Sequence, residues 1–151
     1  MTRILFVCLG NICRSPLVEA VARGEFARAG LAIDVASAGT GGHTAGEPAD
    51  ARALAVARRH GYALSAHRAR QVKAADFDAF DHILAMDRAN LRALQALRSA
   101  GTGAVPALFL DPREVPDPYY GSGADFETVV ALARRGAAAW IERLAPLAAG
   151  A

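Results

Sequence analysis

Cysteine and lysine are scarce in this chain of 151 residues. It holds two cysteines, Cys8 and Cys13, and one lysine, Lys73. Two cysteines cannot build a disulfide-rich scaffold or the four-cysteine site of a structural zinc ion. The two thiols are only five positions apart, so we expect any function that they share to be local.

The sequence also lacks an excess of one charge and a long apolar run. Its 17 basic residues are balanced by 15 acidic ones, and the net charge of +2 with no basic block argues against a nucleic-acid partner. The apolar run at 4–9 is too short for a signal peptide, and a membrane span needs about 20 residues. We therefore expect a cytoplasmic protein with no membrane partner.

Short apolar runs alternate with segments of helical periodicity along the chain. The runs predict four buried strands, at 4–7, 31–37, 82–86 and 105–110. Helices are expected after Ser15, at 48–60, at 74–80, after Asp87 and at 125–147. This order predicts one α/β domain over residues 1–151: a three-layer sandwich with a four-stranded parallel sheet flanked by helices on both faces. Ligands bind such sheets at the carboxyl ends of the strands.

The segment after the first strand carries the clearest chemical pattern. It reads Cys8-Leu9-Gly10-Asn11-Ile12-Cys13-Arg14, and Ser15-Pro16 then fits the start of a helix, with Ser15 as the N-cap. Such a turn can aim backbone N–H groups at an anion, and the helix adds the positive end of its dipole. These groups and Arg14 favour a Cys8 thiolate and bind phosphate oxygens, and Ser15 is near enough to bond the sulfur. The pattern predicts a phosphate-binding loop with a nucleophile, although a cysteine after a buried strand also fits a small core residue.

With its flanking residues, this loop resembles the signature of the low-molecular-weight protein tyrosine phosphatases of bacterial type. Four further segments resemble that family in the same order, at 37–40, 46–50, 67–71 and 117–121. The resemblance covers essentially the whole chain. It implies hydrolysis of phosphotyrosine in proteins, and of small aryl phosphates, through a phosphocysteine intermediate. No metal or cofactor is expected, because the loop itself supplies the positive charge.

The resemblance implies three catalytic residues. Cys8 would be the nucleophile and Arg14 would bind the phosphoryl oxygens. Asp117 would protonate the leaving oxygen and later accept a proton from water. Taken alone, Asp117-Pro118 fits a solvated turn, and Asp111-Pro112 is a competing pair that lacks the tyrosines.

The same resemblance implies a substrate pocket. Tyr119 and Tyr120 would form its wall, where an aromatic ring can pack against them, although one of them also fits a buried packing residue. Many bacterial members carry a tryptophan at the rim, after the segment at 37–40. Here His43 takes that position, so we expect a smaller and more flexible rim and an altered substrate preference.

A supporting set of residues is also implied. In the family, the asparagine of the loop has a left-handed conformation held by a serine and a histidine, which match Asn11, Ser37 and His67. Asp87 matches a family position too, and it fits a helix N-cap equally well. Cys13 would trap an oxidised Cys8 as a disulfide, or else is a packed thiol with no redox role.

Two other enzyme classes share this fold, and a non-catalytic module is a third alternative. Protein-arginine phosphatases usually carry threonine at the position of Ile12 and lack the second aromatic of the Tyr119-Tyr120 pair. Arsenate reductases need further cysteines after Cys13, and the chain has none. A non-catalytic phosphate-binding module is opposed by the presence of Cys8, Arg14 and Asp117 together. We therefore expect phosphotyrosine proteins, a bacterial tyrosine kinase, and phosphate or other oxyanions as partners.

Overall fold

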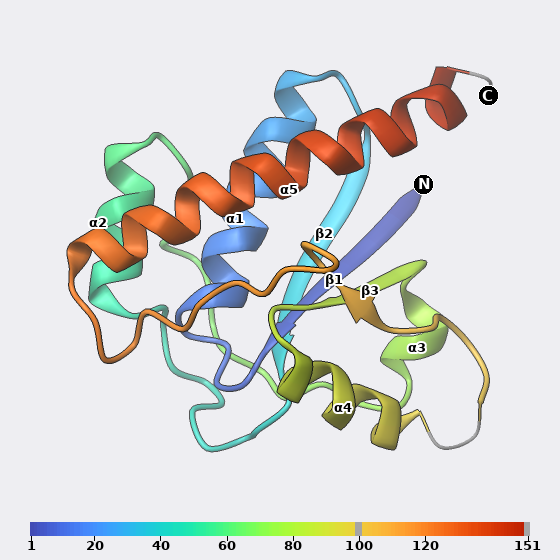
Figure 1. The fold of residues 1–151 in the computed structure, drawn as a ribbon, viewed down its shortest axis with the longest axis horizontal. Coiled ribbons are helices and arrows are strands. Elements are labelled where there is room, and N and C mark those ends of the chain that lie inside the picture. Colours follow the sequence, from blue (N-terminus) through green and yellow to red (C-terminus); the bar gives the residue numbers. More distant parts are fainter. Residues whose placement is uncertain (99–100, 150–151) are drawn as a thin grey trace.

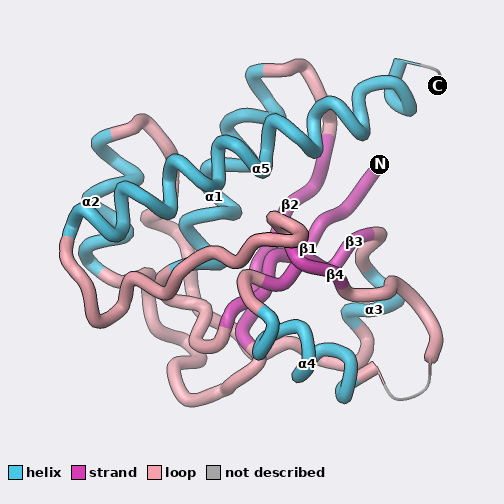
Figure 2. The backbone as a smooth tube through the Cα atoms, in the orientation of Figure 1, coloured by secondary structure: helices cyan, strands magenta, loops and turns pink. Residues whose placement is uncertain are grey.

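Four parallel strands form a single sheet at the centre of the molecule (Figure 2). The computed structural model describes residues 1–98 and 101–149. The strand order is β2-β1-β3-β4. The bounds of the strands are β1 Thr2–Cys8, β2 Ile33–Gly39, β3 His82–Ala85 and β4 Ala107–Leu108.

Helices cover both faces of this sheet (Figure 1). Their bounds are α1 Arg14–Arg28, α2 Ala51–Arg59, α3 Asp76–Ala79, α4 Arg88–Leu97 and α5 Gly123–Ala149. Helices α1, α2 and α5 pack together on one face, and α3 and α4 lie on the other. The predicted three-layer α/β fold with a four-stranded parallel sheet is confirmed.

Strand β1 is buried on both faces, which explains its unbroken apolar sequence. Ile4, Phe6 and Cys8 belong to the core under α1 and α5, whereas Leu5 and Val7 belong to the core under α3 and α4. Successive side chains of a strand point to opposite faces, so a central strand with helices on both sides needs apolar residues throughout. This packing fixes the place where β1 ends and the next loop begins.

The first helix differs from its prediction. It begins at Arg14, with Cys13 as its N-cap residue, and no side chain caps it. The prediction that Ser15 is the N-cap is therefore wrong. The Ser15 hydroxyl lies 3.0 Å from the Cys8 sulfur. It therefore contacts the cysteine at the start of the loop and does not cap the helix.

Two other elements are shorter than expected. Helix α2 begins at Ala51 and not at 48, because Asp50 accepts the N–H of Arg52 and so ends the preceding loop. Strand β4 has only two residues, because Pro106 lacks an N–H before it and Leu110 turns to pair with Arg113 after it. Such a short strand at the sheet edge leaves a long loop before α5.

Candidate active site

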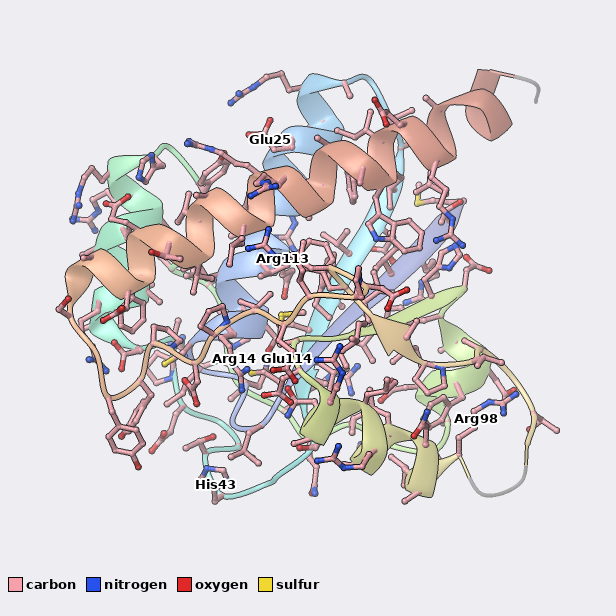
Figure 3. The ribbon with its side chains drawn as sticks, in the orientation of Figure 1. Arg14, Glu25, His43, Arg98, Arg113 and Glu114 are labelled. Carbon is pink, nitrogen blue, oxygen red and sulfur yellow. The ribbon has the colours of Figure 1, made fainter. Side chains whose placement is uncertain are left out.

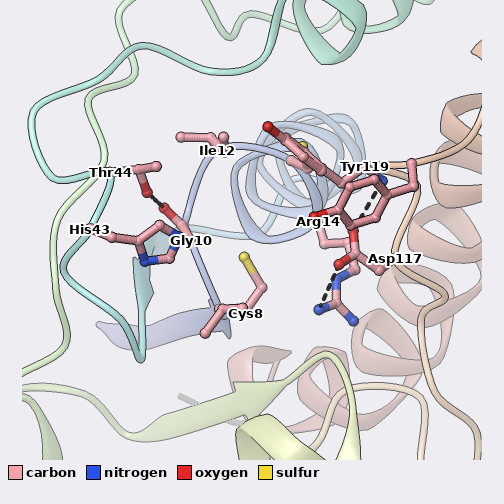
Figure 4. A pocket seen from close by; sticks show the side chains of 11 residues that line it. Cys8, Gly10, Ile12, Arg14, His43, Thr44, Asp117 and Tyr119 are labelled. Atoms are coloured by element: carbon pink, nitrogen blue, oxygen red, sulfur yellow. Dashed lines mark hydrogen bonds and ion pairs between the residues drawn. The ribbon is translucent and has the colours of Figure 1, made fainter.

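The carboxyl ends of the strands meet at one edge of the sheet, where a pocket of about 290 Å³ opens. The pocket takes residues from three segments: the loop after β1, the loop after β2 and the long loop before α5. They are Cys8, Leu9, Gly10, Ile12, Cys13, Arg14, His43, Thr44, Asp117, Tyr119 and Tyr120. Figure 4 shows the Cys8 sulfur between His43 on one side and Arg14 with Asp117 on the other.

Cys8 ends β1 and is almost completely buried. Its sulfur lies 3.0 Å from the Ser15 hydroxyl and accepts the Asn11 backbone N–H at 3.3 Å. The loop that follows packs against the end of β2, where a side chain at Gly39 would come within 2.6 Å of the Leu9 carbonyl oxygen. A backbone N–H that donates to the sulfur, with a hydroxyl within hydrogen-bond distance of it, is an arrangement that can stabilise a thiolate.

Asn11 adopts the left-handed conformation, with φ of 57°, and is fully buried. Its side-chain amide donates to the hydroxyls of Ser15 at 2.8 Å and Ser37 at 2.9 Å. Its side-chain oxygen accepts the Arg70 backbone N–H at 3.0 Å, and its carbonyl oxygen bonds the His67 ring at 2.7 Å. The structure therefore brings Ser37 and His67 to the loop asparagine, together with Arg70, which the sequence did not suggest.

Arg14 lies in the interior at the start of α1 (Figure 3) and is nearly completely buried. Its guanidinium donates to Asp87 at 2.7 Å and to the Val115 carbonyl at 3.0 Å, and it lies 3.8 Å from the Asp117 carboxylate. The other oxygen of Asp87 accepts the Asn90 N–H and caps α4. The N-cap role predicted for Asp87 is therefore confirmed. Its contact with Arg14 holds the guanidinium in one orientation at the pocket.

Asp117 stands at the open side of the pocket. Its side chain is 48% exposed, and its carboxylate accepts the Tyr119 N–H at 3.1 Å. The rings of Tyr119 and Tyr120 meet edge to face, with centroids 4.9 Å apart, and Tyr120 is 95% exposed. The competing Asp111 lines a different surface groove, beside Arg88. A half-exposed carboxyl group that lines the same pocket as a buried thiol is placed to exchange protons with a molecule bound there and with water.

Cys13 is buried at the start of α1 and lines the same pocket. Burial, followed by the negative charge of nearby Asp50, raises the pKa of Cys13 to about 12. Cys13 is therefore a neutral thiol at physiological pH.

Several site residues were missed by sequence reasoning. Thr44 lines the pocket and donates a hydrogen bond from its hydroxyl to the Gly10 carbonyl. Glu19 accepts the Ser37 hydroxyl at 2.6 Å and so supports Asn11 from behind. Glu19 lies in an ordinary helical pattern and Thr44 in a glycine-rich loop, so neither position carries a chemical signal of its own.

In residues 1–98 and 101–149, no group of three or more His, Cys, Asp or Glu side chains is placed to hold a metal ion. None of the helices in these ranges is both long and apolar enough to cross a membrane.

Comparison with known proteins agrees with this geometry. Residues 3–147 match the family model for low molecular weight phosphotyrosine protein phosphatases. A low molecular weight protein-tyrosine-phosphatase of Streptomyces coelicolor is 45% identical over 83% of this chain and 82% of its own length. The crystal structure of YfkJ from Bacillus subtilis superposes with a TM-score of 0.88 at 37% identity, over 97% of this chain and 96% of that one. Vibrio vulnificus Wzb, solved in complex with benzylphosphonate, gives a TM-score of 0.84 at 32% identity, over 95% and 99% of the two chains. The chain therefore belongs to the low molecular weight phosphotyrosine protein phosphatase family.

Proposed function

We propose that this protein hydrolyses phosphotyrosine in proteins, and small aryl phosphates, through a phosphocysteine on Cys8. The observation that carries the proposal is the meeting of a buried thiol, a buried guanidinium and a half-exposed carboxylate in one pocket: Cys8, Arg14 and Asp117. These three groups are what a metal-free transfer of a phosphoryl group requires.

In the first step, the Cys8 thiolate attacks phosphorus as the bond to the tyrosine oxygen breaks. The Asp117 carboxyl donates its proton to that oxygen, so tyrosine leaves as a neutral phenol. The charge on the three equatorial oxygens is stabilised by the Arg14 guanidinium and by backbone N–H groups of the loop. Arg14 can do this without rearrangement, because Asp87 and the Val115 carbonyl already hold it.

In the second step, water attacks the phosphocysteine and the sulfur–phosphorus bond breaks. Asp117, now a carboxylate, takes the proton of that water, and Cys8 leaves as a thiolate. The Ser15 hydroxyl and the Asn11 N–H stabilise the departing sulfur, since both lie within hydrogen-bond distance of it. Inorganic phosphate is released and the enzyme returns to its starting state.

The substrate class follows from the walls of the pocket. Tyr119 is half-exposed at the rim, and Ile12 of the phosphate-binding loop lines the pocket, so both present apolar surface to an aryl ring. This favours phosphotyrosine over phosphoserine, whose short side chain would leave that surface uncovered. Its protein substrates would be made by a tyrosine kinase, which we expect to be bacterial.

Hydrolysis of matched phosphotyrosine, phosphoserine and phosphoarginine peptides tests the proposal. We expect turnover of the phosphotyrosine peptide, no turnover by Cys8→Ser, and retained phosphopeptide binding by that variant. Asp117→Ala should lower kcat by about 10²-fold or more, most for poorly activated leaving groups, while Asp111→Ala serves as the matched control. Substantial activity in Cys8→Ser would disprove the nucleophile, and faster turnover of phosphoarginine would disprove the substrate class.

Cys13 and the cellular compartment complete the proposal. We expect Cys13 to trap an oxidised Cys8 as a disulfide, and both cysteines are free thiols lining one pocket. A mechanism that depends on the Cys8 thiolate suits a reducing compartment, and we therefore expect the protein to act in the cytoplasm.

A further inference from the structure

The loop that carries Asp117 has few polar links to the rest of the molecule. Two hydrogen bonds lie inside the loop, from Tyr119 N–H to Asp117 and from Gly121 N–H to the Pro118 carbonyl. Within the part of the chain that the structure describes, residues 116–121 receive hydrogen bonds from only one side chain outside the loop. That side chain is Arg52 of α2. Apart from these, the polar link of Asp117 is its 3.8 Å ion pair with Arg14.

Arg52 binds this loop at two carbonyl groups and one ring. Its guanidinium donates to the Tyr119 carbonyl at 2.9 Å and to the Gly121 carbonyl at 3.1 Å. It also lies over the Tyr119 ring, 5.7 Å from the centroid, and over the Phe126 ring at 4.7 Å. Tyr119 is thus held at its carbonyl by Arg52, while its N–H holds the Asp117 carboxylate.

The other half of the Arg52 guanidinium is bound by Asp50. Two N–H groups of Arg52 meet the two oxygens of that carboxylate at 3.0 Å each. Hydrogen bonds from Arg52 are the largest cause that lowers the pKa of Asp50. A planar guanidinium held at both edges has a defined orientation, which a lysine ammonium cannot reproduce.

Asp50 is in turn joined to the phosphate-binding loop. Its backbone N–H donates to the Ile12 carbonyl at 2.8 Å, and its carboxylate lies close enough to Cys13 to raise the pKa of that thiol. A continuous polar path therefore runs from Ile12 through Asp50 and Arg52 to Tyr119 and the loop of Asp117.

We propose that Arg52 is a positioning residue, which holds the Asp117 loop at its working distance from the phosphate-binding loop. Arg52 is not among the residues that line the pocket, and its charge is neutralised by Asp50. It therefore acts through Asp117 and not through the substrate phosphate. The inference rests on the proposed function of Asp117 as the proton donor.

Arg52→Met tests this role, with Arg58→Met as the matched control. Arg58 is an exposed arginine of the same helix, and its side chain makes no hydrogen bond or ion pair in the described part of the chain. We expect Arg52→Met to lower kcat on a phosphotyrosine peptide about tenfold, with KM changed less than about twofold. Arg52→Lys should lower kcat as much as Arg52→Met. Lysine keeps the charge but lacks the planar guanidinium that donates to Asp50 and to the loop carbonyls together. A raised KM with unchanged kcat, restored by lysine, would mean that Arg52 binds substrate and would overturn the proposal.

A double-substitution cycle separates action through Asp117 from a general loss of activity. In the Asp117→Ala background, Arg52→Met should lower kcat by less than about twofold, because the group that it positions is absent. An equal loss in both backgrounds would contradict the proposal.

Amide hydrogen exchange gives a readout that does not need turnover. The Tyr119 and Gly121 amides should exchange faster in Arg52→Met than in wild type or Arg58→Met. Unchanged exchange would overturn the positioning role whatever the activity. A wild-type protein that fails to hydrolyse phosphotyrosine would instead refute the proposed function, while the exchange rates still decide whether Arg52 holds the loop.

Discussion

At the scale of single residues, Asn11 shows how much a short loop depends on distant segments. A non-glycine residue in the left-handed region costs about 1–3 kcal/mol and persists only when its surroundings hold it there. Here Ser15, Ser37, His67 and Arg70 all bond it, from three different parts of the chain. The family resemblance pointed to two of these partners. Arg70 contributes only its backbone N–H, a contact that no side-chain pattern announces.

Asn11→Ala and Asn11→Gly separate the side chain from the backbone. Both should lower the free energy of unfolding by about 2–4 kcal/mol, because buried donors and acceptors lose their partners. Alanine should cost about 1 kcal/mol more than glycine, since only glycine adopts a positive φ freely. Urea denaturation measures both values. Wild-type stability in Asn11→Gly would show that the side-chain hydrogen bonds contribute little.

The raised pKa of Cys13 leads to a prediction, also at the scale of single residues, about how disulfide formation depends on pH. Disulfide formation needs a thiolate, and the pKa of about 12 keeps Cys13 protonated at neutral pH. As the pH rises from 7 to 9, the thiolate fraction of Cys13 rises about tenfold per unit. After a fixed dose of peroxide, peptide mapping should therefore find more Cys8–Cys13 disulfide, relative to over-oxidised Cys8, at the higher pH. Cys13→Ala is the control without a disulfide, and a ratio independent of pH would contradict the prediction.

At the scale of elements, α5 shows a conflict between helix propensity and packing. Gly136 lies inside this helix, where glycine is normally unfavourable by about 1 kcal/mol relative to alanine. A Cβ atom at this position would come within 2.2 Å of the Phe109 ring, which is buried and packs edge-on against Phe6. The helix therefore reaches the core only because residue 136 has no side chain.

Gly136→Ala should destabilise the protein by about 1–3 kcal/mol, against the direction that helix propensity alone predicts. Gly123→Ala is the matched control, because no atom lies within 4 Å of its Cβ position at the start of the same helix. That variant should be neutral or slightly more stable. Thermal or urea unfolding of both variants gives the answer, and a stabilised Gly136→Ala would show that Phe109 moves aside at no cost.

At the scale of the whole molecule, one tyrosine joins the three helices of one layer. Tyr62 follows α2, and its hydroxyl donates to Glu25 of α1 at 2.6 Å while accepting from Arg134 of α5 at 2.8 Å. Glu25 lies on the side of α1 that faces α5 (Figure 3). Desolvation and the hydrogen bond to Glu25 raise the pKa of Tyr62, so the phenol stays neutral.

Tyr62→Phe should lower the free energy of unfolding by about 1 kcal/mol, because two hydrogen bonds are lost while Glu25 and Arg134 keep contact with water. Activity should not change, since Tyr62 does not line the pocket. Tyr120→Phe is the control for stability. Because the Tyr120 side chain is exposed, the loss of its hydroxyl should leave the free energy of unfolding unchanged. A loss of kcat in Tyr62→Phe with stability intact would mean that the helix layer controls the site directly.

The parts of this protein that depend on local spacing could be predicted from its amino-acid sequence. The alternation of apolar runs and helical periods predicted the fold, and the segment from Cys8 to Arg14 predicted a phosphate-binding loop, because a strand, a tight turn and a helix start lie within a few residues. Only the folded chain shows that the Ser15 hydroxyl contacts the Cys8 sulfur and does not cap the helix, and that Cys13 is buried near Asp50. It alone also joined Asp50 and Arg52 to the loop of Asp117. The physical reason is that these contacts depend on distances between segments far apart in the chain, which are set by how the helices pack and not by any local pattern.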